Sequence, residues 1–186
     1  MSPDIRRLAG RTALVTGSTG GLGVAIASAL AAEGAFVVVS GRDTARGDAV
    51  VADIRSAGGT AEFVVADLGE GEHEVRRLAE QATVVAGGRI DILVNNAAML
   101  LMPTPTAEIS EELLRDAFAV NVFAPFLLTG ALAPAMVERG EGAIVNIGSI
   151  TGLRGGDGSA STAPTRRRST RSLSRGPPNT GGSACG

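Results

Sequence analysis

A glycine-rich turn near the N-terminus places the tightest constraint on how this chain can fold. The segment Thr16-Gly17-Ser18-Thr19-Gly20-Gly21-Leu22-Gly23 follows a short apolar run, residues 12–15, and precedes apolar residues at helical spacing. A strand, a glycine turn and a helix in this order are the context that a dinucleotide-binding site requires. Glycine lets the chain turn sharply, lets backbone N–H groups approach a pyrophosphate and lets the helix pack closely on the strand. The helix N-terminus then offers unpaired N–H donors to phosphate.

Apolar runs alternate with helical patterns along the chain as far as residue 147. We expect strands at residues 12–16, 35–40, 61–66, 90–95 and 143–147, and helices at residues 21–33, 43–57, 72–85 and 110–138. Continuously apolar strands that alternate with helices of this length predict a parallel sheet covered on both faces. The expected fold class is therefore α/β, a doubly wound, Rossmann-like parallel sheet. The last helix is expected to bend near Pro125 or Pro134.

The residues after the second expected strand bear on which dinucleotide would bind. In a dinucleotide-binding fold an acidic residue there accepts hydrogen bonds from the ribose hydroxyls, whereas an arginine suits a 2′-phosphate. This chain has Arg42 at that position and Asp43 next to it. Arg42 favours NADP(H) over NAD(H), while Asp43 leaves NAD(H) open. The alternative is that Arg42 only solvates a loop.

Four more motifs follow the glycine turn in order. Asp67-Leu68 ends the third expected strand, Asn95-Asn96-Ala97-Ala98 ends the fourth, Asn121 lies in the long helix, and Ser149 follows the fifth strand. Together with the turn they resemble the short-chain dehydrogenase/reductase family over about residues 11–161. The resemblance implies that a nicotinamide dinucleotide would be bound by Gly17, Ser18, Thr19, Gly21, Leu22, Gly23, Arg42, Asp67, Leu68, Asn95 and Ala97.

The same resemblance implies catalytic roles for two residues. The hydroxyl of Ser149 would hydrogen-bond the substrate carbonyl or alcohol and stabilise the charge that develops in the transition state. Asn121 would hold a water that passes protons to a catalytic lysine. The alternative for Asn121 is a core asparagine whose amide is satisfied by hydrogen bonds. The implied reaction is hydride transfer between a nicotinamide dinucleotide and a ketone or secondary alcohol.

The tyrosine and lysine on which the family's reaction depends are missing. The chain contains no tyrosine, and all 17 of its basic residues are arginine. In the family the tyrosine gives or takes the proton during hydride transfer, and the lysine four residues later brings the phenol pKa toward working pH. Thr162 and Arg166 occupy the two positions. We therefore expect weak cofactor binding and no measurable turnover.

The composition changes abruptly after Ser161. We take residues 1–161 as a partial dinucleotide-binding domain that is incomplete at its C-terminal side. Residues 162–186 hold five arginines and no acidic residue, with almost no apolar periodicity, so they predict a disordered tail. The fifth expected strand would then have an unpaired edge.

A frameshift would explain the tail. Codons read one base earlier over Ser161–Ser172 can encode Tyr-x-Ala-x-Lys followed by an amphipathic helix, with the tyrosine at position 162. Our hypothesis is that the chain is a truncated, frameshifted product of a family gene, with the shift between Ser149 and Thr162, in the stretch 155–161.

Composition and charge bear on compartment and partners. The net charge is −2, and the single cysteine, Cys185, cannot form an internal disulfide. The longest apolar run is far below the about 18 residues of a membrane span, so we expect a cytoplasmic protein with no membrane partner. The only histidine, His73, lies among acidic residues, and no cluster has metal-ligand spacing, so we expect no metal.

Two functions from other classes stay open. A non-catalytic dinucleotide-binding protein or sensor would have dispensed with tyrosine and lysine. An arginine-rich tail could bind nucleic acid, but no aromatic residue accompanies it for base stacking, so we do not favour this function.

The resemblance also implies a homo-oligomer, which we do not expect here because one of the helices that build that contact is absent. The substrate does not follow from the fold.

Overall fold

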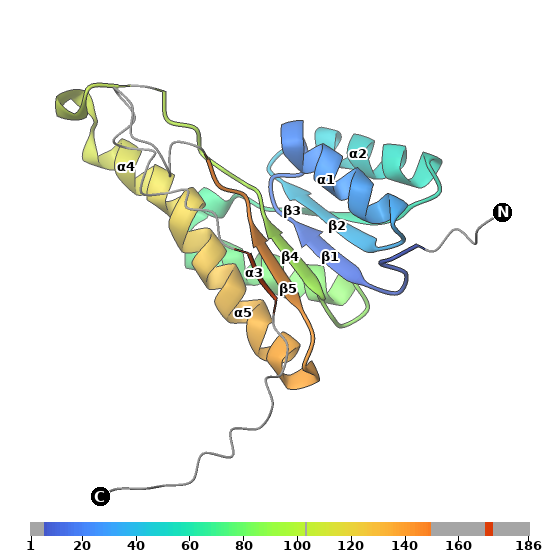
Figure 1. Ribbon diagram of the computed structural model, residues 1–186. Coiled ribbons are helices and arrows are strands. Elements are labelled where there is room, and N and C mark those ends of the chain that lie inside the picture. The colour runs from blue at the N-terminus through green and yellow to red at the C-terminus, as the bar shows by residue number, and fades with distance from the viewer. Residues whose placement is uncertain (1–5, 103, 150–169, 173–186) are drawn as a thin grey trace, which may run out of the picture.

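The structure, a computed structural model, describes residues 6–102, 104–149 and 170–172. Its sheet has the strand order β3-β2-β1-β4-β5-β6 (Figure 1). The strands are β1 Thr12–Val15, β2 Phe36–Gly41, β3 Thr60–Val65, β4 Ile92–Asn95, β5 Ala143–Asn146 and β6 Thr170–Ser172. All pairings among β1 to β5 are parallel, which confirms the predicted Rossmann-like α/β sheet.

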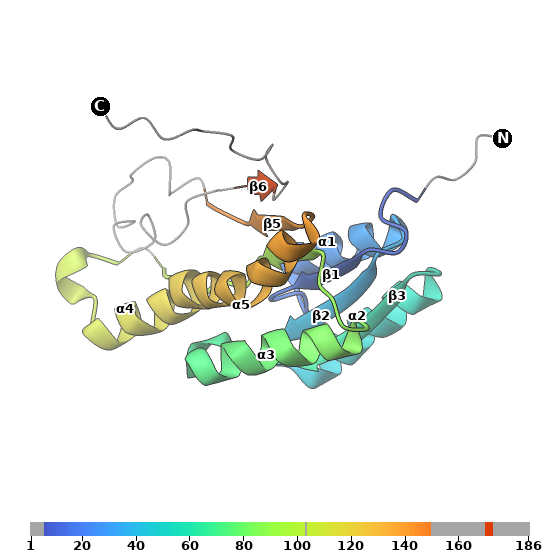
Figure 2. The same ribbon diagram turned by 90° about the horizontal axis from the view of Figure 1, so that it is seen from below.

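Helices cover both faces of the sheet. They are α1 Gly21–Ala32, α2 Thr44–Ser56, α3 Glu72–Val85, α4 Glu111–Phe118 and α5 Ala124–Arg139, with short turns η1 Leu68–Glu70, η2 Thr106–Glu108 and η3 Ala119–Phe123. Side chains of α1 and α2 pack in one hydrophobic cluster and those of α3 and α5 in the other. Figure 2 shows α3 and α5 lying side by side beneath the sheet.

The two clusters follow from the alternation of side chains along each strand. In β1, Leu14 joins the cluster beneath α3 and α5, and its neighbour Val15 joins the cluster beneath α1 and α2. In β2, Val38 and Val39 divide in the same way. Successive residues of a strand point to opposite faces, so a sheet covered on both sides needs apolar residues at every position.

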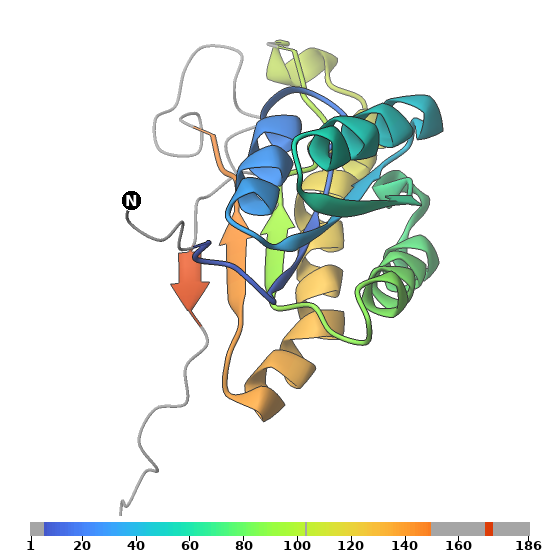
Figure 3. The same cartoon turned by 90° about the vertical axis from the view of Figure 1, so that its right-hand side faces the viewer.

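The last strand, β6, corrects one expectation from the sequence. It pairs antiparallel with β5, with Ala143 opposite Ser172 and Val145 opposite Thr170 (Figure 3). The predicted unpaired edge of β5 is therefore wrong for these residues, because a short extended segment of the tail supplies the hydrogen-bond ladder. The proposed site of the frameshift, and the rest of the predicted disordered tail, lie outside the described residues.

The long helical stretch Glu111–Arg139 is interrupted by a π-helical turn. Ser110 caps its start, because the Ser110 hydroxyl accepts a hydrogen bond from the Leu113 N–H at 3.2 Å. The π-helical turn, η3, ends just before Pro125, one of the two positions where we expect a bend. Pro134 lies inside α5.

By length and composition this stretch, whose most apolar 18-residue window has a mean hydropathy of 1.7, could cross a membrane. That is weak support for a membrane span, because a helix that covers the core of a soluble protein passes the same test. On α5, the side chains of Leu128 and Met136 are fully buried against the sheet and α3.

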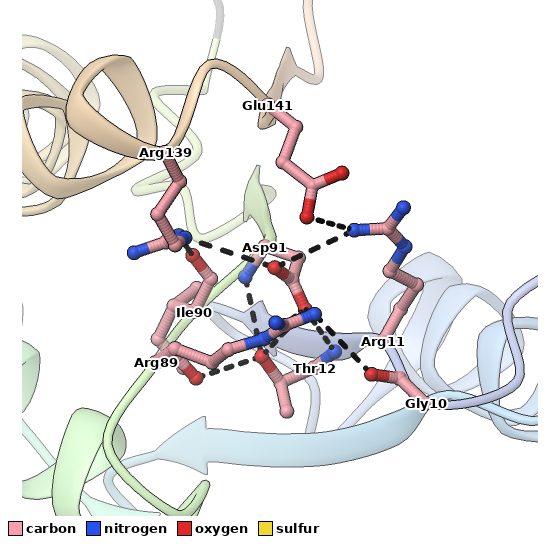
Figure 4. Close-up of polar contacts among 8 residues, drawn as sticks. All are labelled: Gly10, Arg11, Thr12, Arg89, Ile90, Asp91, Arg139 and Glu141. Atoms are coloured by element: carbon pink, nitrogen blue, oxygen red, sulfur yellow. Dashed lines mark hydrogen bonds and ion pairs between the residues drawn. The ribbon is translucent and has the colours of Figure 1, made fainter.

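A buried carboxylate joins elements at the N-terminal end of β4 (Figure 4). Asp91 Oδ2 accepts hydrogen bonds from the Thr12 backbone N–H at 2.9 Å and from Arg89 Nη2 at 3.0 Å. Arg11 Nη1 and Arg139 Nη2 each lie 3.9 Å from Asp91 Oδ1, and the aspartate side chain is only 4% exposed. A charge buried this deeply needs such partners. Asp91 therefore links the starts of β1 and β4 to the end of α5.

Candidate functional site

A cleft of about 610 Å³ lies at the C-terminal ends of the parallel strands. In open α/β sheets this edge is where ligands bind. The cleft is lined by Gly17, Thr19, Gly20, Leu22, Gly23, Ser40, Gly41, Arg42, Ala66, Asp67, Leu68, Asn96, Ala97, Ala98, Met99, Val120, Ile147 and Gly148. Of the predicted cofactor-binding residues, Gly17, Thr19, Leu22, Gly23, Arg42, Asp67, Leu68 and Ala97 are among these; Ser18, Gly21 and Asn95 are not.

The glycine turn packs directly against the end of β4. Gly17 has φ +62°, and a Cβ there would lie 2.7 Å from the Cα of Ala97. A Cβ on Gly23 would lie 2.6 Å from Asn96 Nδ2. Both positions therefore need glycine, the first for its backbone conformation and for space, the second for space alone.

Next to these crowded glycines the turn is open. A Cβ on Gly20 or Gly21 would meet no atom within 4 Å. Gly20 is the N-cap of α1, and no side chain makes a capping hydrogen bond at the start of this helix. Helix N-termini present unpaired N–H donors and a partial positive charge, and they bind phosphate for this reason. The residues present therefore fit the pyrophosphate of a dinucleotide.

Ser18 has a structural contact rather than a place in the cleft. Its side chain is fully buried, and its hydroxyl donates to the Val15 carbonyl at 2.6 Å and accepts from the Ser40 N–H at 3.0 Å. These bonds tie the glycine turn to β2. The Ser18 backbone N–H also donates to the Ser40 carbonyl, at 2.9 Å, so the side chain and the backbone N–H both serve this link.

Asn96 is a cleft residue that we did not predict as a site residue from the sequence. Its side-chain amide donates to the carbonyls of Thr16, at 2.9 Å, and Gly17, at 3.1 Å. In return, Thr16 Oγ1 accepts from the backbone N–H groups of Asn96 and Ala97, both at 3.0 Å. The preceding residue, Asn95, is buried and donates instead to Asn146 Oδ1 at 2.8 Å. The only signal for Asn96 in the sequence was its place in the paired-asparagine motif.

At the other side of the cleft, Arg42 and Asp67 face each other. Arg42 Nη1 lies 3.7 Å from Asp67 Oδ2. Asp43, which left NAD(H) open in the sequence, is the N-cap of α2: its carboxylate accepts from the Arg46 N–H at 3.0 Å, and it does not line the cleft. Of the two neighbours, only Arg42 therefore faces the cleft.

The backbone of Asp67 is held by α3. Its N–H donates to Glu74 Oε1 at 3.3 Å, and Arg77 Nε donates to Glu74 Oε2 at 2.7 Å. The hydrogen bond from Arg77 keeps the pKa of Glu74 below its usual range, so Glu74 stays an acceptor at neutral pH.

Asn121 lies in the π-helical turn, and both ends of its side-chain amide bind the backbone of Met99. Its Oδ1 accepts from the Met99 N–H at 2.8 Å, and its Nδ2 donates to the Met99 carbonyl at 3.0 Å. The side chain of Asn121 therefore contacts the backbone of Met99, and its catalytic role stays a prediction.

Ser149 follows β5, directly after two residues that line the cleft, Ile147 and Gly148. The structure thus brings the end of β5 to the same cleft as the glycine turn and the end of β4. Within the described part of the chain, no group of three or more histidine, cysteine or acidic residues could hold a metal ion.

Comparison with known proteins gives a consistent result. Residues 11–162 match the family described as short chain dehydrogenase. The chain is 43% identical over 150 residues to an uncharacterized oxidoreductase of Mycobacterium tuberculosis, and the match covers 80% of this chain and 56% of that protein. It is 41% identical over 143 residues to human dehydrogenase/reductase SDR family member 4, a match that covers 77% of this chain and 51% of the relative. The chain therefore spans about half the length of these curated relatives.

Solved structures are similar over the same region. A metagenomic short-chain oxidoreductase in complex with NADP superposes with a TM-score of 0.81 at 36% identity, covering 86% of this chain and 71% of that one. A 3-oxoacyl (acyl-carrier-protein) reductase from Agrobacterium tumefaciens C58, with NADP bound, gives a TM-score of 0.80 at 37% identity and covers 87% and 61% of the two chains.

Proposed function

The chain belongs to the short-chain dehydrogenase family, and on this basis we propose that its cleft binds NADP(H). We propose further that the full-length enzyme to which it is related transfers hydride between the nicotinamide and a ketone or secondary alcohol. The nicotinamide would supply or accept the hydride. The chain's own residues would bind and orient the dinucleotide.

One observation carries the binding proposal: the open turn at Gly20, which starts α1, and the guanidinium of Arg42 share one cleft. The turn suits a pyrophosphate, and Arg42 suits a 2′-phosphate. The use of Asp43 as a helix cap supports NADP(H) over NAD(H), because that carboxylate is engaged away from the cleft. The two NADP-bound relatives support the same preference.

We propose that this chain, as written, binds cofactor weakly and catalyses no turnover. It contains no tyrosine and no lysine, so it lacks the family's proton donor and the ammonium that tunes it. Ser149 could still hydrogen-bond a carbonyl, but no phenol would deliver the proton. A non-catalytic dinucleotide-binding protein is the second candidate, and the same two absences favour it. A cytoplasmic location without membrane or nucleic-acid partners remains part of the proposal.

Cofactor titration of the purified chain tests the binding proposal. Calorimetry should give a lower Kd for NADPH than for NADH, and Arg42→Ala should weaken NADPH binding about tenfold while it leaves NADH binding almost unchanged. Arg46→Ala is the matched control, because Arg46 pairs with Asp43 outside the cleft. Equal affinity for the two cofactors, or no binding of either, would contradict the proposal, and so would carbonyl reduction comparable to that of family members.

Resequencing the coding DNA from Ser149 to Ser172 separates the two candidates. An additional base that opens a frame with tyrosine and lysine four residues apart would make the gene product an ordinary enzyme of the family. A confirmed sequence would favour the non-catalytic binding protein.

A further inference from the structure

We propose that Asp67 weakens the preference of this cleft for a 2′-phosphate by holding Arg42 in an ion pair that the phosphate must displace. This inference rests on the proposed binding of NADP(H). It makes Asp67 a positioning residue that acts through Arg42, in addition to any contact of its own with the nucleotide.

The two oxygens of the Asp67 carboxylate have different partners. Oδ1 accepts a hydrogen bond from the Gly69 N–H at 2.9 Å and caps the turn η1. Oδ2 faces Arg42 Nη1 at 3.7 Å. One oxygen therefore holds the local backbone, and the other is available to the arginine.

The positions of the two residues are fixed by the sheet. Gly41 in β2 is paired with Val65 in β3, and the Ala66 N–H donates to the Gly41 carbonyl at 3.0 Å. Arg42 directly follows Gly41, and Asp67 directly follows Ala66, so the two residues come just after adjacent, hydrogen-bonded strand ends. Both side chains line the cleft. The ion pair thus lies at the place where the chain would meet the ribose of the adenosine half.

The Arg42–Asp67 ion pair is weak enough for a phosphate to take the place of Asp67 at the guanidinium. Its 3.7 Å separation exceeds hydrogen-bond distance, and the Arg42 side chain is 76% exposed. Exposed pairs of this kind stabilise a fold only slightly. A 2′-phosphate carries about −1.5 to −2 charges and several strong acceptor oxygens, so it competes well for the guanidinium.

The consequence depends on the ligand. A 2′-phosphate gains Arg42 only by displacing Asp67, and part of its binding free energy offsets the broken ion pair. A ribose with a free 2′-hydroxyl leaves the ion pair intact, so none of its binding free energy offsets a broken pair. Asp67 therefore lowers affinity for one class of nucleotide and not for the other.

The substitution Asp67→Asn tests this in the full chain. The amide oxygen of asparagine can still accept from the Gly69 N–H, but the neutral side chain no longer holds Arg42. Calorimetry with 2′,5′-ADP and with 5′-AMP isolates the adenosine half of the site. We expect the Kd for 2′,5′-ADP to fall about three- to tenfold, as loss of one nearby charge at high dielectric predicts, with the Kd for 5′-AMP changed less than about twofold.

Two further variants make the result specific. Glu62→Gln removes the same charge from β3 outside the cleft lining, where Glu62 pairs with Arg55, and should leave both affinities unchanged. In an Arg42→Ala background, Asp67→Asn should lose most of its effect on 2′,5′-ADP, because no arginine remains to be released.

The outcomes separate the inference from the proposed function. If the wild-type chain binds neither nucleotide, the proposed function fails and the inference fails with it. If the wild type prefers 2′,5′-ADP but Asp67→Asn shifts both affinities equally, or acts as strongly without Arg42, only the inference is overturned. Weaker binding of 2′,5′-ADP by a folded Asp67→Asn variant would overturn it as well.

Discussion

At the scale of single residues, the structure gives buried polar groups defined partners far away in the sequence. Asp91 is the clearest case, because its carboxylate contacts Thr12, Arg89, Arg11 and Arg139 (Figure 4). These contacts hold the end of the sheet opposite the cleft. Their role is therefore stability and not ligand binding.

Replacement of Asp91 should destabilise the fold strongly. Asp91→Ala leaves the Thr12 N–H without its acceptor and removes the charge between the arginines, which should cost about 3 kcal/mol of unfolding free energy in urea denaturation. Asp91→Asn should cost less, because its amide oxygen can still accept from Thr12. Glu111→Gln, which breaks an exposed pair with Arg115, serves as the control and should cause no measurable change. An Asp91→Ala variant as stable as the wild type would contradict this role.

A second residue-scale prediction concerns pH. The hydrogen bonds from Arg7 lower the pKa of Glu33 from 4.5 to about 2. Because the folded pKa lies below the unfolded one, the pair stabilises the fold above pH 4.5, and this contribution disappears as the pH falls through about 2. Arg7→Ala should move the Glu33 pKa, followed by carboxyl NMR, back toward 4.5. A titration unchanged by the substitution would show that Arg7 is not the cause.

At the scale of elements, the π-helical turn η3 controls the loop after β4. Asn121 in this turn supplies both a donor and an acceptor to the backbone of Met99. The loop that borders the cleft is thus held by a helix that begins well after it.

Removal of the Asn121 amide should loosen this loop. Asn121→Ala leaves the partly buried N–H and carbonyl of Met99 unpaired, at a cost of about 1–2 kcal/mol, and should speed hydrogen exchange of the Met99 amide. Glu112→Ala, on the exposed side of α4, is a control that should change neither quantity. Unchanged exchange at Met99 in the Asn121→Ala variant would rule out this contact as the support of the loop.

At the scale of the whole molecule, α5 has a buried and an exposed apolar side. Leu128 is fully buried beneath the sheet, whereas Phe126 is 77% exposed. The first contributes to the core shared with α3. The second leaves a large apolar side chain on the surface of the described structure, next to the half-exposed Phe123.

Substitutions on the two sides of α5 should differ strongly in their effect on the free energy of unfolding. Leu128→Ala should lower the free energy of unfolding by about 2–5 kcal/mol, because it removes core contacts and leaves a cavity. Phe126→Ser should change that free energy by less than about 0.5 kcal/mol, because this side chain is mostly exposed. Equal destabilisation by both variants would mean that the two sides of α5 are buried alike.

Local patterns predicted the elements well. The strands and helices lie close to their expected positions because apolar periodicity and capping residues act over a few neighbouring residues. The last helix was expected to start at residue 110, and Ser110 is its N-cap. The π-helical turn was not predicted, since the sequence indicated only a bend near Pro125, and β6 was not predicted because three residues in an arginine-rich tail carry no strand pattern.

The sequence by itself determined the class of fold, the glycine turn and the absence of tyrosine and lysine, because these depend on residue identity and short-range order. Only the tertiary structure decided that Asn96 secures the turn, that Ser18 is tied to β2, that Asp43 caps a helix and that Arg42 meets Asp67. Most of these partners lie more than 20 residues apart in the chain. Their contacts depend on strand register and side-chain packing, which no local pattern encodes.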